Sequence, residues 1–212
     1  MTSLESLLRK IESALKQEQE IRETSQEDMR KVTSLSKKAI LLVHQKRRKK
    51  AEKLIQEANE ILSRLNEAAE EYPEVIYSGL FDAARQEFSE ANIFLRSTKE
   101  SKFIPPEEIN IPPVHYILGL ADVIGEYRRL ALDALREGSP EKGEEYLHTM
   151  DQIYTELMAM DQTYILVRGL RRKCDIARRI IETTRGDVTQ EVRRSSLEKR
   201  LTEFEKTLQK SK

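Results

Sequence analysis

The sequence predicts an all-α protein, built as a single helical bundle. Its 212 residues include only 7 glycines and 6 prolines, and 35% of the residues are charged. Apolar residues recur every three or four positions through most of the chain, which places them on one face of a helix. Scarce helix breakers, abundant charge and this periodicity together favour long amphipathic helices over sheets. A chain of this length can bury a substantial core.

The N-terminal part of the chain predicts two long helices. The first spans about residues 4–45, where an apolar stripe begins with Leu4, Leu7, Leu8, Ile11 and Leu15. Five adjacent cations at 46–50 follow. Their mutual repulsion favours a bend or a short loop there, although the spacing alone leaves a continuous helix open. A second helix continues until Pro73 ends it, because proline lacks the N–H that a helix needs.

The remaining chain predicts further helices between proline and glycine breaks. The segment 103–113 holds four of the six prolines and must be a loop. We interpret Gly138 as the C-terminal cap of one helix, Ser139 as the N-cap of the next and Pro140 as its first residue. We expect a break between helices at Gly186-Asp187. The helices expected around these breaks cover about residues 75–98, 114–136, 141–160, 163–184 and 189–208. No repeat or linker divides the chain, so we expect one domain over residues 1–212.

Composition narrows the classes of function. Lys+Arg and Asp+Glu both number 37, but nucleic-acid binding depends on where cations gather rather than on the total. The single cysteine, Cys174, excludes an intramolecular disulfide and a multi-thiolate zinc site, and we interpret it as a structural or solvated thiol. No apolar run reaches the length of a membrane span, and the N-terminus lacks a signal-peptide core. We therefore expect a cytoplasmic protein without a membrane partner.

Two carboxylate pairs are the candidate catalytic groups. Glu87 and Glu90 lie three residues apart, and Asp122 and Glu126 four apart, so each pair shares a helical face. Asp122 is the only charge between Ile117 and Gly125, and a buried carboxylate needs a cation or a metal beside it. Two such faces could form an oxygen site for Mg²⁺ or Mn²⁺, which suits phosphodiester cleavage.

Structural interpretations of these carboxylates remain open at the level of spacing. Glu87 and Glu90 could form a solvated acidic face, and Asp122 could pair with an arginine such as Arg85. A di-iron site is a weaker alternative, because it requires two Glu-x-x-His motifs and the chain has one, Glu145 to His148. The histidines at 44, 115 and 148 share no metal-ligand spacing, so each is more simply explained by packing or surface exposure.

Positive charge gathers in two places that could contact phosphates without reading sequence. One is the basic run at 46–50, and the other is the start of the helix after Thr163. The candidate RNA-binding residues in the second place are Arg168, Arg171, Arg172 and Lys173. A solvated cationic face balanced by nearby acids explains any one of these residues equally well.

Four stretches make the chain resemble the translin family, and within it the translin-associated factor X (TRAX) branch. They are EQEIRE at 18–23, SKKAILLVH at 36–44, QEFSEA at 86–91 and, closest of all, PVHYILGLADVIGE at 113–126. The likeness extends more faintly from about Glu18 to Arg185. The resemblance implies an all-α bundle whose subunits assemble into hollow octamers around RNA or single-stranded DNA.

For this chain, the resemblance implies an Mg²⁺-dependent endoribonuclease acting on RNA, single- or double-stranded, within a homo-oligomer, an octamer by analogy. Glu87, Glu90 and Asp122 fall on positions that look like the TRAX catalytic and metal-binding carboxylates. Glu126 also matches, but translin-type subunits carry a glutamate there too, so a supporting role is expected. The alternative is a translin-like shell that binds RNA or single-stranded DNA without cutting it.

Overall fold

The computed structural model describes residues 3–100, 102–160, 162 and 166–210. All regular structure within these residues is helical, which confirms the all-α class. The chain divides into two compact units, Met1–Gly119 and Leu120–Lys212, called here the N-terminal and C-terminal units. Helix α5 (Pro113–Arg136) runs from the first into the second. A single domain over the whole chain therefore stays a prediction.

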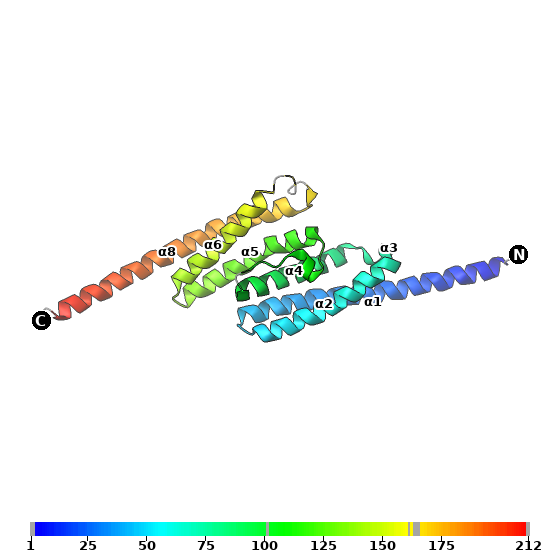
Figure 1. The fold of residues 1–212 in the computed structure, drawn as a ribbon, viewed down its shortest axis with the longest axis horizontal. Helices are drawn as coiled ribbons and strands as arrows, with labels where there is room; N and C mark the ends of the chain where they lie inside the picture. The colour runs from blue at the N-terminus through cyan, green and yellow to red at the C-terminus, as the bar shows by residue number, and fades with distance from the viewer. Residues whose placement is uncertain (1–2, 101, 161, 163–165, 211–212) are drawn as a thin grey trace. The chain divides into compact units, whose positions relative to one another are not determined.

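The N-terminal unit is a layered set of helices (Figure 1). Its elements are α1 (Leu4–His44), α2 (Arg48–Glu71), α3 (Pro73–Ile76), α4 (Gly79–Glu100), the 3-10 helix η1 (Pro106–Ile109) and the start of α5. Helix α1 packs along α2 and α4. Three phenylalanines of α4 at helical spacing, Phe81, Phe88 and Phe94, are at most 1% exposed and fill this core. The expected helix at 4–45 is confirmed. The single helix expected at 75–98 is wrong at its start, because α3 ends at Ile76 and α4 begins at Gly79, and the expected proline-rich loop at 103–113 contains η1.

The chain turns within the basic run, as charge repulsion favours. Lys46 adopts a left-handed φ of 60°, and its N–H donates to the carbonyl of Val43 while that of Arg47 donates to Leu42. This pattern satisfies the last carbonyls of α1 and ends the helix. The remaining basic residues, from Arg48 onward, already belong to α2.

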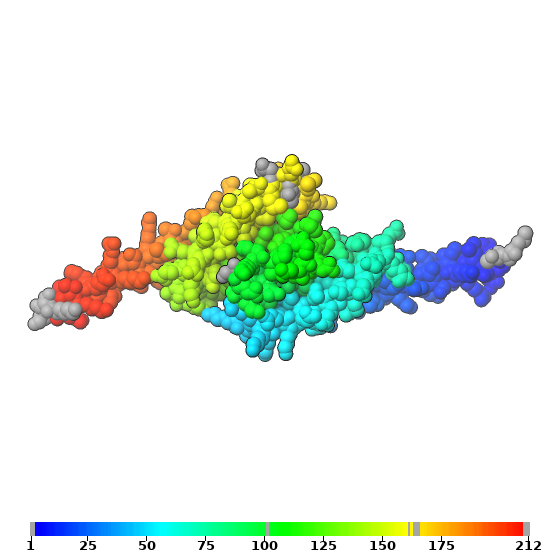
Figure 2. Space-filling view, viewed as in Figure 1, coloured from blue at the N-terminus to red at the C-terminus, as the bar shows by residue number. Residues whose placement is uncertain are grey.

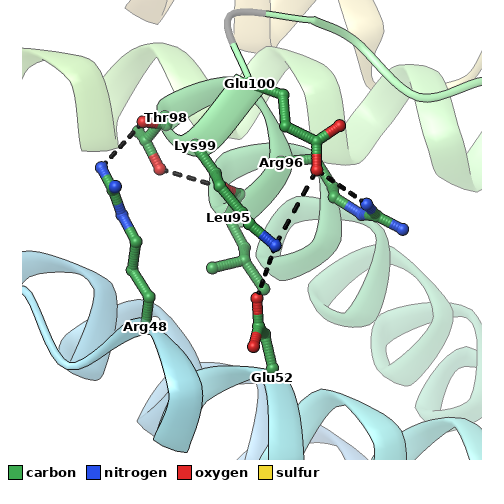
Figure 3. A network of polar contacts seen from close by, with 7 residues as sticks. All are labelled: Arg48, Glu52, Leu95, Arg96, Thr98, Lys99 and Glu100. Carbon is green, nitrogen blue, oxygen red and sulfur yellow. Dashed lines mark hydrogen bonds and ion pairs between the residues drawn. The ribbon is translucent and has the colours of Figure 1, made fainter.

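Arg48 ties the start of α2 to the end of α4 (Figure 3). Its Nη2 donates to the carbonyl of Thr98 at 2.8 Å, and Lys99 Nζ lies 2.9 Å from Glu52 Oε1. Lys99 also reaches Glu100, which pairs with Arg96 at 2.9 Å. A cationic donor on one of the last carbonyls of α4 compensates for a backbone group that the helix cannot satisfy itself.

We expect Arg48→Ala to lower the free energy of unfolding by about 0.5–1.5 kcal/mol, because Thr98 loses a donor in an exposed setting. Lys49→Ala is the matched control, since Lys49 is the next residue of the same helix and is exposed. Urea titrations of both variants measure the difference. Equal stabilities would show that the Arg48 contact contributes nothing.

The C-terminal unit comprises the rest of α5, α6 (Pro140–Met158) and α8 (Leu170–Lys210). Gly138, at φ +73°, ends α5 and Pro140 begins α6, as expected. Ser139 occupies the N-cap position, but its side chain makes no capping hydrogen bond. Each of the three helices carries side chains that are at most 1% exposed, among them Val123, Ile124, Met150, Leu170 and Cys174.

The predicted break at Gly186-Asp187 is wrong, because α8 runs without interruption from Leu170 to Lys210. Thr184 and Val188, on either side of the glycine and four residues apart, are 0% and 2% exposed. Asp187 pairs with Arg128 of α5 at 3.6 Å. Packing of this face outweighs the roughly 1 kcal/mol that a mid-helix glycine costs. The beginning of the expected helix at 163 lies outside the described residues.

Among the described helices, none combines the length and the apolar content needed to cross a membrane.

Candidate metal centre and nucleic-acid interface

Helix α4 presents the first carboxylate pair at the edge of the core of the N-terminal unit. Phe88 and Ala91 are 1% and 0% exposed, which fixes the rotation of this part of the helix. Glu90 is itself only 9% exposed, whereas the Glu87 side chain is 23% exposed. Glu87 Oε1 lies 3.3 Å from the Nζ of Lys37 on α1. The pair is therefore not a solvated acidic face, because both side chains are largely covered.

Helix α5 comes into direct backbone contact with this segment at Gly119. A Cβ added to Gly119 would lie 2.9 Å from the carbonyl oxygen of Gln86, the amide nitrogen of Glu90 and the Cβ of Ser89. Only glycine allows this approach, because real Cβ atoms essentially never come so close to backbone atoms. The segment of α4 that carries Glu87 and Glu90 is therefore what approaches Gly119.

Asp122 of α5 is held by a cation in the C-terminal unit. Lys173 Nζ of α8 donates to both of its oxygens, at 2.5 Å and 2.6 Å. The two side chains are 29% and 23% exposed. A carboxylate with both oxygens on one ammonium is already neutralised. The expectation that Asp122 needs a cation is thus met by Lys173, a residue that we predicted for RNA binding.

Arg85, the partner proposed as an alternative for Asp122, is engaged elsewhere. Its Nη2 donates to the Asn66 side-chain oxygen at 2.6 Å, and its guanidinium lies 3.7 Å from the centroid of the Phe81 ring. Burial lowers the pKa of Arg85, an effect that Tyr77 and Asp82 partly oppose. Sequence reasoning missed this role, although the i,i+4 spacing of Phe81 and Arg85 was a signal for it.

The other candidate residues lie as follows. Glu126 is half-buried on α5, and its spacing from Asp122 puts the two on one face of that helix. Arg168, Arg171 and Arg172 are exposed around the start of α8. Within the described residues the first turn of α8 contains no acidic residue, although Lys173 there is paired with Asp122 of α5.

The three histidines lie in different settings. The His44 ring lies 5.0 Å from that of Phe94 at an angle of 40°, His115 Nε2 lies 2.9 Å from Asp82 Oδ1, and His148 is exposed. Cys174 is 1% exposed, and burial, with a smaller effect of Asp175, raises the pKa of its thiol. A thiol that is buried and hard to ionise is a poor nucleophile, which fits the structural interpretation of Cys174.

The chemistry of the candidate carboxylates fits a hard divalent cation. Their oxygens are the ligands that Mg²⁺ and Mn²⁺ prefer, and two of the three already face an ammonium group, Glu87 that of Lys37 and Asp122 that of Lys173. In the part of the chain that is described, no three His, Cys, Asp or Glu side chains are gathered around one point as metal ligands. The carboxylate oxygens are therefore of the type that Mg²⁺ or Mn²⁺ would bind.

Comparisons with known proteins define the class as a translin-type helical fold. The chain resembles AfC3PO bound to duplex RNA, with a TM-score of 0.76 and 32% identity over 87% of this chain and 95% of that one. AfC3PO solved alone gives a TM-score of 0.75 and 34% identity over 87% and 96%. NeC3PO without ligand shares the fold, with a TM-score of 0.78 and 22% identity over 87% and 96%.

The family model described as "Translin family" matches residues 20–210. This chain belongs to the translin family. An uncharacterized protein of Methanocaldococcus jannaschii is 38% identical over 135 residues, which are 63% of this chain and 59% of that protein. The match thus spans less than two thirds of that relative's length. Membership confirms the translin part of the resemblance, while the TRAX branch remains a prediction.

Proposed function

We propose that this protein binds RNA inside a closed homo-oligomer, an octamer by analogy with the family, and cleaves it as a metal-dependent endoribonuclease of the TRAX type. Family membership and the likeness to AfC3PO, which has been solved with duplex RNA, support RNA as the ligand. The observation that carries the proposal is the covered acidic segment of α4, into which Gly119 brings the backbone of α5.

Glu87, Glu90 and Asp122 are the residues that would hold one or two Mg²⁺ or Mn²⁺ ions, with Glu126 in support. When bound, such an ion would activate water and stabilise the charge that develops on the phosphate. Glu87 and Asp122 are each neutralised by a lysine before any metal enters.

The positive charge at the start of α8 would position the RNA. Arg168, Arg171 and Arg172 are exposed, and Lys173 joins this stretch to Asp122 through its ion pair. Contacts of this kind fix a duplex by its phosphates and do not select a sequence. We therefore expect binding that weakens steeply with salt and depends little on RNA sequence.

The second candidate function is a translin-like shell that binds RNA or single-stranded DNA without cutting it. Duplex and single-stranded RNA labelled at the 5′ end distinguish the two. Incubated with the purified protein in Mg²⁺, the strands should shorten, and EDTA should stop cleavage. A shift of intact RNA in a native gel under both conditions would support the binding shell and contradict the nuclease.

A further inference from the structure

Each end of the chain carries an apolar stripe that nothing in its own unit covers. Helix α1 makes its first hydrogen bond to another element at Gln17, which reaches Tyr72. Before that point Leu4, Leu8, Ile11 and Leu15 are 47–70% exposed. Near the end of α8, on both sides of Lys199, which pairs with Glu141 of α6, the apolar residues are equally exposed. Leu197, Leu201, Phe204 and Leu208 are 52–62% exposed.

Figure 2 shows these two segments as the blue start of α1, which extends past the other elements of the N-terminal unit, and the red end of α8, which extends past α6. We call residues 4–15 the N-terminal stripe and residues 197–208 the C-terminal stripe. Contiguous apolar residues exposed on helical extensions mark surfaces that another molecule covers.

Both stripes have the spacing of a coiled coil. Successive apolar residues are separated by four, three and four positions in each of them, which is the alternation of core positions d and a in a heptad. Each stripe therefore offers four core layers of the same length and in the same order. Two matching stripes of this kind can pair layer by layer.

The charges that flank the stripes select the pairing. In the N-terminal stripe the e positions are Glu5 and Glu12, which form exposed ion pairs along α1 with Arg9 and Lys16, and the g positions, Leu7 and Ala14, are uncharged. Beside the C-terminal stripe the g positions are Arg193, four residues before Leu197, Arg200 and the uncharged Thr207, and neither arginine has an ion-pair partner among the described residues. A parallel coiled coil places g of one helix beside e of the next heptad of the other.

A parallel pair of one N-terminal and one C-terminal stripe thus brings opposite charges together, Arg193 beside Glu5 and Arg200 beside Glu12. Two N-terminal stripes offer no such match: in antiparallel order their glutamates face each other, and in parallel order the glutamates face Leu7 and Ala14. Two C-terminal stripes match only in parallel order, where Arg200 of each lies beside Glu205 of the other. That order would crowd both bundles together at the same end of two helices whose axes are about 10 Å apart, which disfavours it.

We infer that the N-terminal stripe of one copy of this chain pairs with the C-terminal stripe of a second copy as a parallel two-stranded coiled coil. The core layers are Leu4 with Leu197, Leu8 with Leu201, Ile11 with Phe204, and Leu15 with Leu208. In this order the tip of each extension meets the base of the other, so the two bundles lie at opposite ends. The interface goes beyond the proposed function, since it needs neither RNA nor metal.

Such a contact is heterologous, because different surfaces of the two copies meet. Repeated from copy to copy, it closes into a ring or continues into a filament, depending on the rotation per step. Four layers bind weakly in isolation, but within a closed assembly each contact forms at high effective concentration. The N-terminal stripe lies before residue 20, where the family match begins.

Cysteine cross-linking tests the pairing directly. In full-length protein carrying Cys174→Ala, Leu8→Cys and Leu201→Cys are made as two separate variants and mixed, then oxidised with copper phenanthroline. We expect a cross-linked dimer in the mixture and at least about tenfold less in either variant alone. Ser13→Cys mixed with Thr202→Cys, on the outer faces, is the matched control and should not cross-link.

Other outcomes overturn the inference. Cross-linking of Leu8→Cys alone, or of Leu201→Cys alone, at the yield of the mixture would show pairing of like stripes. A disulfide formed within one chain carrying both substitutions, and absent from the mixture, would show that the stripes pair in cis. No cross-link in any sample would show that neither stripe pairs with the other.

Exchanging the charges that flank the two stripes tests the same pairing without cysteines. Glu5→Arg with Glu12→Arg, and separately Arg193→Glu with Arg200→Glu, should each weaken self-association by roughly 3- to 10-fold, since exposed ion pairs contribute modestly. All four changes in one chain should restore the wild-type mass in light scattering. If the wild-type mass is not restored, the pairing is wrong. RNA cleavage is measured separately on protein that still assembles, and its result bears on the proposed nuclease alone.

Discussion

Asp122→Asn is expected to reduce RNA cleavage in Mg²⁺ by at least about 100-fold, because it removes the negative charge from a proposed metal-binding group without changing its size. The same change replaces a charged partner of Lys173 with a neutral one. Both side chains are partly exposed, at 29% and 23%, so the free energy of unfolding should fall by no more than about 1 kcal/mol. The loss of activity would then not reflect unfolding.

Asp133→Asn is the matched control for this experiment. Asp133 lies on the same helix and also pairs with a basic side chain, Arg136, at 2.9 Å. It belongs to neither candidate pair, so cleavage should stay within about twofold of the wild-type rate. The measurement is the single-turnover rate on labelled RNA with enzyme in excess. Equal rates for wild type and Asp122→Asn would remove Asp122 from the site.

Gly119→Ala is expected to destabilise the protein by about 1–2 kcal/mol. The new methyl group would sit 2.9 Å from the carbonyl of Gln86 and the amide of Glu90, and backbone atoms of a packed helix cannot turn aside. Overpacking of this kind typically costs about 1–3 kcal/mol, and the gain from alanine's higher helix propensity recovers only part of it. Because the contact lies at the α4 carboxylates, RNA cleavage should fall as well.

Gly125→Ala provides the control, since it is the same substitution in the same helix. A Cβ there meets nothing within 4 Å, so alanine should stabilise the protein by about 0.5–1 kcal/mol through helix propensity alone. Chemical denaturation of the two variants gives the comparison. A stabilised Gly119→Ala protein would show that α4 and α5 do not touch closely at this position.

Most of the fold could be read from the sequence because helical periodicity and proline positions are local signals. The ends of α5 and the start of α6 followed from Pro113, Gly138 and Pro140. The continuity of α8 could not be read in this way. Gly186 is a local signal for a break, but burial of Thr184 and Val188 against the rest of the C-terminal unit decides the outcome.

The candidate site was predictable in kind but not in its contacts. Spacing showed that Glu87 shares a face with Glu90 and that Asp122 would need a cation. It could not name Lys173, which is 51 residues away from Asp122 in the chain, or Lys37, which reaches Glu87 from α1. Such partners depend on how the helices pack against one another, and local sequence patterns do not specify that packing.

The central claim is that Glu87, Glu90 and Asp122 bind a divalent cation. Mn²⁺ binding to the purified protein, followed by the electron paramagnetic resonance signal of the free ion, tests it without relying on cleavage. Wild-type protein should take up Mn²⁺ in competition with Mg²⁺, and the combined variant Glu87→Gln, Glu90→Gln and Asp122→Asn should lose that uptake. Equal uptake by wild type and the combined variant, or none by wild type, would contradict the account.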